Sequence, residues 1–106
     1  MLRISFVNQY YVLLYAPVRG GTECVFTFRN DFLPAGMFRY SGLFPSAVSE
    51  QRSYVLNALE DATASAIFKK LDAEDHSDYP YAKELQRTYV IELMHLLLKN
   101  KALYGS

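Results

Sequence analysis

The sequence has one cysteine, no tryptophan and no long apolar run. With Cys24 alone the chain cannot form an internal disulfide or a zinc site built on several cysteines, and a reducing cytoplasm is the expected compartment. A bilayer-spanning helix needs about 20 apolar residues, and no segment approaches that length. The apolar stretch from Ile4 to Val7 is too short for a secretory signal. These absences exclude a disulfide-rich secreted domain and predict no membrane partner.

The chain also lacks an excess of charge of either sign, because 11 basic residues balance 11 acidic ones. Residues 1–53 carry five basic and three acidic residues, a net of +2, and residues 54–106 carry six basic and eight acidic residues, a net of −2. Proteins that bind nucleic acid directly obtain much of their affinity from a basic surface that neutralises phosphates. We therefore expect no direct nucleic-acid binding by this chain.

Three segments in the first third predict antiparallel β-strands. Leu2–Val7 and Glu23–Arg29 alternate between apolar and polar residues, as a strand with one buried face does. Tyr10–Ala16 is continuously apolar, which predicts a strand covered on both faces. Asn8-Gln9 and Gly20-Gly21 supply the hairpin turns.

From Asn30 to Ser53 the periodic pattern is lost, since glycine and proline interrupt it repeatedly. We predict an irregular segment anchored on the sheet by its large apolar side chains: Phe32, Leu33, Met37, Phe38, Tyr40, Leu43 and Phe44. Tyr54–Leu56 is either a short strand or the lead into a helix.

The last half predicts two antiparallel helices. The first begins at a cap provided by Asp61 or Thr63 and runs to about Ala73. Its apolar face consists of Ala62, Ala66, Ile67 and Leu71. An acidic loop, Asp72–Tyr79, leads to a second helix from Pro80 to about Lys101.

These elements predict a single α+β domain spanning residues 1–106. Residues 1–53 form its β-rich and irregular part, a small antiparallel sheet of three or more strands, and residues 54–106 form a helical hairpin.

The second helix carries more apolar surface than a helix covered on one side needs. One stripe consists of Leu85, Tyr89, Leu93, Leu96 and Leu97, and a neighbouring stripe consists of Val90, Ile91, Met94 and Leu98. Either the domain covers both stripes as core, or one stripe packs on the sheet and the other contacts a partner. Both interpretations remain open at the level of sequence.

No constellation of catalytic or metal-ligating residues can be assembled. His76 lies among carboxylates whose spacing fits no calcium loop, and His95 lies mid-helix between Met94 and Leu96 without the spacing of a metal-binding motif. Cys24 lies on the same face of its predicted strand as Phe26 and Phe28. Its thiol is therefore expected to be buried and inert. We therefore predict no catalytic residue, no metal, no cofactor and no enzymatic activity.

Sixteen aromatic residues, nine tyrosines and seven phenylalanines, are the remaining unusual feature. Pockets for small molecules are lined mainly by apolar side chains with a few polar tips. Tyr10, Tyr15 and Phe26 are the candidate ligand-binding residues on this argument, and the alternative is that they belong to the core or to an interface.

The order of these features resembles the sensing and dimerisation domain of AraC-type transcription regulators. The resemblance rests on Val25-Phe26-Thr27-Phe28 followed by Asp31-Phe32-Leu33, then an irregular aromatic segment and two helices. The aliphatic run from Val90 to Lys99 is similar to the dimerisation helix of that family. The resemblance implies a partial cupin-like barrel, without the front half of the barrel and without the DNA-binding domain.

Two functional hypotheses follow. The resemblance implies a non-catalytic regulatory domain that pairs with a second copy and responds to a small-molecule effector; its contact residues would be Tyr89, Leu93, Met94, Leu97 and Leu98. The alternative is a complete small protein, of the kind encoded by phages and mobile elements, that binds and inhibits a larger target protein. The short length and the absence of an output domain favour that alternative.

Overall fold

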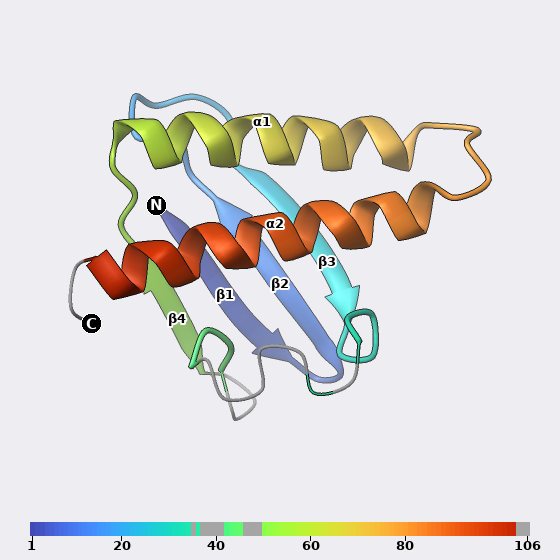
Figure 1. Cartoon of the computed structure of the whole chain (residues 1–106), viewed down its shortest axis with the longest axis horizontal. Helices are drawn as coiled ribbons and strands as arrows, with labels where there is room; N and C mark the ends of the chain where they lie inside the picture. The colour runs from blue at the N-terminus through green and yellow to red at the C-terminus, as the bar shows by residue number, and fades with distance from the viewer. Residues whose placement is uncertain (35, 37–41, 46–49, 104–106) are drawn as a thin grey trace.

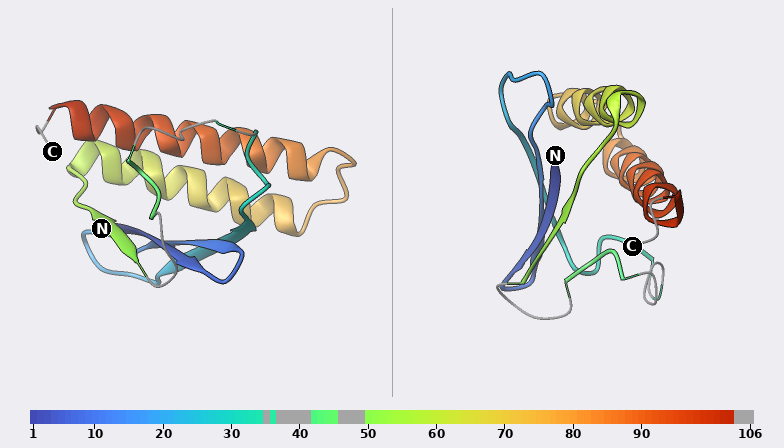
Figure 2. Two further views of the ribbon diagram at one scale, coloured as in Figure 1. Left: turned by 90° about the horizontal axis from the view of Figure 1, so that it is seen from below. Right: turned by 90° about the vertical axis from the view of Figure 1, so that its left-hand side faces the viewer.

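The computed structural model describes residues 1–34, 36, 42–45 and 50–103, without the side chains of residues 101–103. Within them, the elements in chain order are β1 (Leu2–Val7), β2 (Tyr10–Tyr15), β3 (Cys24–Arg29), β4 (Gln51–Tyr54), α1 (Ala58–Asp75) and α2 (Ala82–Leu103). The strands form one antiparallel sheet in the order β3-β2-β1-β4. Both helices cross the same face of this sheet (Figures 1 and 2). The predicted α+β class is confirmed.

Two hairpins build the centre of the sheet. β1 and β2 join through Asn8-Gln9, and Asn8 has a φ of 59°, a left-handed conformation that asparagine tolerates. β2 and β3 join through a turn in which Gly20 and Gly21 also have positive φ. The three strands predicted from the sequence are confirmed to within one residue at each end. The sheet is open, so a barrel is not confirmed.

The fourth strand corrects the prediction for the residues before the helices. The sequence predicts irregular chain up to Ser53, whereas Gln51–Tyr54 pairs with β1, with Tyr54 opposite Leu2. Three of its four residues are exposed, so β4 lacks the apolar alternation that marks the other strands. Its pairing depends on backbone hydrogen bonds to β1, a long-range contact.

The irregular segment is anchored as predicted where the structure describes it. Leu43 is buried, and Phe32, Leu33 and Phe44 pack against the core. Met37, Phe38 and Tyr40 lie outside the described residues.

Helix α1 begins earlier than predicted. The Asn57 side chain accepts a hydrogen bond from the Glu60 backbone N–H (2.8 Å), and the Glu60 carboxylate accepts one from the Asn57 N–H (2.9 Å). This reciprocal capping box fixes the first turn, so the predicted caps at Asp61 and Thr63 are wrong. At its other end α1 continues to Asp75, and the first residues of the predicted acidic loop are therefore helical.

The buried face of α1 also differs from the prediction. Ile67 and Leu71 are buried as expected, but Ala62 and Ala66 are exposed. Ala64 and Phe68 take their place, because α1 packs on both the sheet and α2.

Helix α2 begins at Ala82 and ends at Leu103, two residues after each predicted boundary. Its residues Val90, Leu93, Met94 and Leu97 have no exposed surface, so members of both predicted stripes belong to the core of this chain. Tyr89, Leu96 and Leu98 are partly buried against the same core. No helix in the described part of the chain has the length and apolar character needed to cross a membrane.

One face of the sheet remains open. Leu2, Ile4, Leu13, Phe26 and Phe28 point toward the helices and are buried. No described helix or strand covers the opposite face (Figure 2). The prediction that β2 is covered on both faces is therefore wrong for this chain, since Val12 and Leu14 are half-buried and Tyr10 is exposed.

Candidate functional site

The polar groups at the N-terminal end of α1 serve packing. Asn100 on α2 donates hydrogen bonds from Nδ2 to both carboxylate oxygens of Glu60 (3.0 and 3.1 Å) and to the Val55 carbonyl (3.1 Å). Glu60 is buried and its carboxylate also accepts from the Asn57 N–H. These N–H groups provide hydrogen bonds to the buried Glu60 carboxylate. The contacts from Asn100 also hold α2 against the start of α1.

Tyr15 makes the second buried polar connection, between the sheet and α1. Its hydroxyl donates to Asp61 Oδ1 (2.8 Å) and lies 3.1 Å from the Asp61 carbonyl oxygen. Burial raises the pKa of Tyr15 to about 12, with a further contribution from the hydrogen bond to Asp61 and from its charge. A phenol held neutral in this way is a structural donor.

His76 and the carboxylates near it lie at the end of α1, whereas His95 lies on α2. The ring of exposed His76 is 3.0 Å from the Asp72 carbonyl oxygen, and this hydrogen bond raises the pKa of His76, with the charges of Asp72 and Asp75 adding to the effect. In the described part of the chain, no group of three histidine, cysteine, aspartate or glutamate side chains is placed to hold a metal ion.

The residues predicted to contact a second copy lie on the inner side of α2. Leu93, Met94 and Leu97 are completely buried in the chain itself. Tyr89 is half-buried beside α1, where Lys70 Nζ lies 5.4 Å from its ring centroid, and Leu98 packs against the core. Two copies can pair through the buried side chains of this set only if α2 moves away from the sheet. The predicted homodimer contact is not tested by the structure and stays a prediction.

The residues predicted to bind a ligand are not gathered in one place. Tyr15 is buried against Phe68, with ring centroids 5.3 Å apart. Tyr10 and Phe26 both line a shallow cavity of about 480 Å³ beside β3, although their strands direct them to opposite faces of the sheet. The three side chains therefore do not form the single pocket that the sequence argument requires.

Two shallow cavities follow the free edge of β3 and meet at Phe26 and Asp75. The first, of about 350 Å³, lies between the start of β3 and the last turns of α1. The second, of about 480 Å³, lies between the end of β3 and the first turns of α2. Because they share these lining residues, we treat the two cavities as one surface and call it the β3-edge groove.

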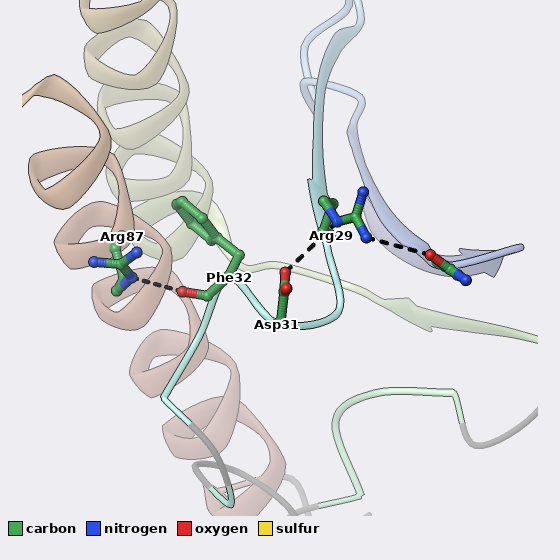
Figure 3. Close-up of polar contacts among 5 residues, drawn as sticks. Arg29, Asp31, Phe32 and Arg87 are labelled. Atoms are coloured by element: carbon green, nitrogen blue, oxygen red, sulfur yellow. Dashed lines mark hydrogen bonds and ion pairs between the residues drawn. The ribbon is translucent and has the colours of Figure 1, made fainter.

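Residues of the turn after β3 line the Arg29 end of this groove, and Figure 3 shows their contacts. Arg87 on α2 donates from Nε to the Phe32 carbonyl (2.6 Å), and its guanidinium lies 5.0 Å from the Phe32 ring centroid. Asp31 forms an ion pair with Arg29 at 3.8 Å. Sequence reasoning missed this groove, because no local pattern shows that β3 lies at an edge or that the helices pass over it.

The architecture is thus an open four-stranded antiparallel sheet with two antiparallel helices on one face, in the described residues. Comparison of the chain with protein-family models, with curated proteins and with solved structures finds no match.

Proposed function

We propose that this chain is a non-catalytic protein-binding domain whose main contact surface is the open face of its sheet. The observation that carries the proposal is the apolar character of a face that nothing in the described chain covers. Val7, Tyr10 and Val25 are 54%, 39% and 59% exposed there. Val12 and Leu14 lie half-buried between them in the strand register. Contiguous apolar surface of this kind marks interaction sites.

The charges on this face indicate the chemistry of the partner. Arg3 and Arg29 are the charged side chains that the described strands direct to it, and neither strand β1 nor β2 contributes a carboxylate. The Nε atom of Arg3 is buried and has no hydrogen-bond acceptor among the described residues. A partner surface with an apolar centre and a carboxylate near Arg3 would cover the apolar side chains and balance the arginine charge.

A second copy of the chain fits this face less well. Two identical faces placed against each other bring together surfaces that carry arginine and no carboxylate on β1 and β2. The AraC-like regulatory role, with homodimer pairing through α2 and a small-molecule effector, remains the second proposal. It draws support from the two antiparallel helices that follow the sheet.

The experiment compares two single glutamate substitutions at exposed apolar positions. Val7→Glu lies on the open face, and Leu59→Glu, at a position 78% exposed on α1, is the matched control. Immobilised wild-type and variant domains are used to capture proteins from a cell extract, and the captured set is quantified by mass spectrometry. We expect proteins that bind wild type and the Leu59→Glu control to be lost with Val7→Glu.

A captured set that both variants retain equally would contradict the open face as the contact surface. Light scattering on the same three proteins shows whether the lost contact is with a second copy, since a wild-type dimer that Val7→Glu dissociates would assign this face to self-association.

A further inference from the structure

The free edge of β3 offers backbone hydrogen-bonding groups. Antiparallel strands pair through alternate residues, and just beyond β3 the Asn30 N–H donates to the Gln9 carbonyl (2.9 Å). The even-numbered residues of β3 therefore bond to β2. Val25 and Thr27 direct their N–H and C=O groups away from the sheet, and no hydrogen bond within the described structure reaches them.

The helical hairpin covers the space beside this edge. Figures 1 and 2 show that the end of α1, the start of α2 and the turn that joins them extend beyond β3. The β3-edge groove lies beneath this overhang, with Phe26 and Phe28 of the strand on one side and Phe68 and Leu71 of α1 above. An extended peptide strand can form hydrogen bonds with the backbone groups of this edge and is thin enough to fit under the helices.

The two ends of the groove differ in charge. At the Cys24 end the lining acids Glu23, Asp72 and Asp75 outnumber Lys69. At the Arg29 end the lining bases Arg29, Lys83 and Arg87 outnumber the acids Asp31 and Asp75, the second of which is shared with the other end; Arg29 is paired with Asp31. The groove therefore has an acidic end and a basic end, with aromatic side chains between them.

We propose that the β3-edge groove binds an extended peptide segment of a partner protein, which adds to the sheet as a fifth strand antiparallel to β3. Antiparallel pairing is the more stable arrangement. In this orientation the peptide runs from the Arg29 end of the groove, where its N-terminus lies, to the Cys24 end. The segment that fits has, in chain order, an acidic residue near Lys83 and Arg87, an apolar residue opposite Phe26 and a basic residue near Asp72.

The overhang blocks one competitor, a second copy paired antiparallel and edge to edge through β3. In a joined sheet the second copy would carry its helices on the same face, in the layer that the hairpin of the first copy already occupies (Figure 1). A single strand brings no such layer. The inference goes beyond the proposed function, because it concerns an edge and not the open face.

The test uses two capped peptides of equal composition. The first, Ser-Glu-Thr-Val-Thr-Lys-Ser, matches the groove, and the second, Ser-Lys-Thr-Val-Thr-Glu-Ser, exchanges the two charges. Titration into the isotope-labelled domain should shift the amide signals of Val25 and Thr27 and slow their hydrogen exchange. At low salt the matched peptide should bind roughly tenfold more tightly than the exchanged peptide. The matched peptide forms two exposed ion pairs with the groove, whereas the exchanged peptide meets two like charges.

A charge-reversed domain provides the control. In the Asp72→Lys, Lys83→Glu double variant the preference should invert, so that the exchanged peptide binds more tightly. Both positions are exposed, and the substitutions place a cation near the end of α1 and an anion in the first turn of α2, where the helix dipoles favour them. The double variant is therefore expected to fold.

Equal binding of the two peptides, a preference unchanged in the double variant, or no response of the Val25 and Thr27 amides at millimolar peptide would each overturn the inference. So would protection of these amides that grows with protein concentration alone, since it would assign the edge to a second copy. The Val7→Glu variant should bind the matched peptide as wild type does, which keeps this result separate from the test of the open face.

Discussion

Single polar side chains fix how the helices lie on the sheet. Tyr15 connects β2 to Asp61 on α1, and Asn100 connects α2 to Glu60 on α1. A buried polar group left without its partner costs about 1–3 kcal/mol. Sliding or rotation of either helix breaks one of these contacts, whereas apolar contacts alone tolerate small displacements. The two pairs thus fix the position of each helix more narrowly than apolar contacts alone would.

The raised pKa of Tyr15 predicts a loss of stability at alkaline pH. Its pKa is about 12 in the folded chain and 10.0 in the unfolded chain, so the contribution of the neutral phenol is complete below pH 10 and is lost as the pH rises through 12. Urea unfolding of wild type and Tyr15→Phe at pH 9 and pH 11.5 measures how much the phenol contributes to the free energy of unfolding at each pH. The stability difference between the two proteins should shrink by no more than about 1.4 kcal/mol per pH unit. A difference that stays constant across this range would show that the phenol ionises equally in both states.

At the scale of elements, the start of α1 depends on Asn57. Asn57→Ala removes the side-chain acceptor of the capping box and should destabilise the domain by about 0.5–2 kcal/mol. Thr63→Ala is the matched control, because the Thr63 hydroxyl donates to the Leu59 carbonyl within the helix and caps nothing. Chemical denaturation of both variants compares them. A larger loss in Thr63→Ala than in Asn57→Ala would place the cap where the sequence analysis expected it.

The elements that sequence reasoning found are those with a local signal. Apolar alternation identifies β1 and β3 because one face of each packs on the helices. β4 has no such pattern and forms through pairing with β1, which lies far away in the chain. The start of α1 was predictable in principle, since Asn57 and Glu60 have the spacing of a capping box. The β3-edge groove was not, because strand order and helix overhang arise only from the assembled fold.

At the scale of the whole molecule, apolar surface is distributed unevenly between the two sides of the sheet. The helix side is closed, and its core runs from Leu2 and Ile4 on β1 to Leu93 and Leu97 on α2. The other side keeps a smaller apolar surface centred on β2, with Val12 and Leu14 half-buried. The apolar excess that the sequence shows in α2 is therefore largely buried within the chain, whereas the excess in β2 lies on the open face.

This distribution predicts opposite outcomes for the same substitution on the two sides. Leu97 has no exposed surface, so Leu97→Glu places a carboxylate in the core, and the expected cost of more than about 4 kcal/mol is most of the stability of a small domain. Val7→Glu places the same charge on the open face, where the side chain reaches water, and should leave the fold intact. Circular dichroism during heating, with light scattering for mass, separates the cases. If Leu97→Glu melts cooperatively like wild type and halves the mass, α2 is an interface between copies and its burial in the single chain is not the functional state.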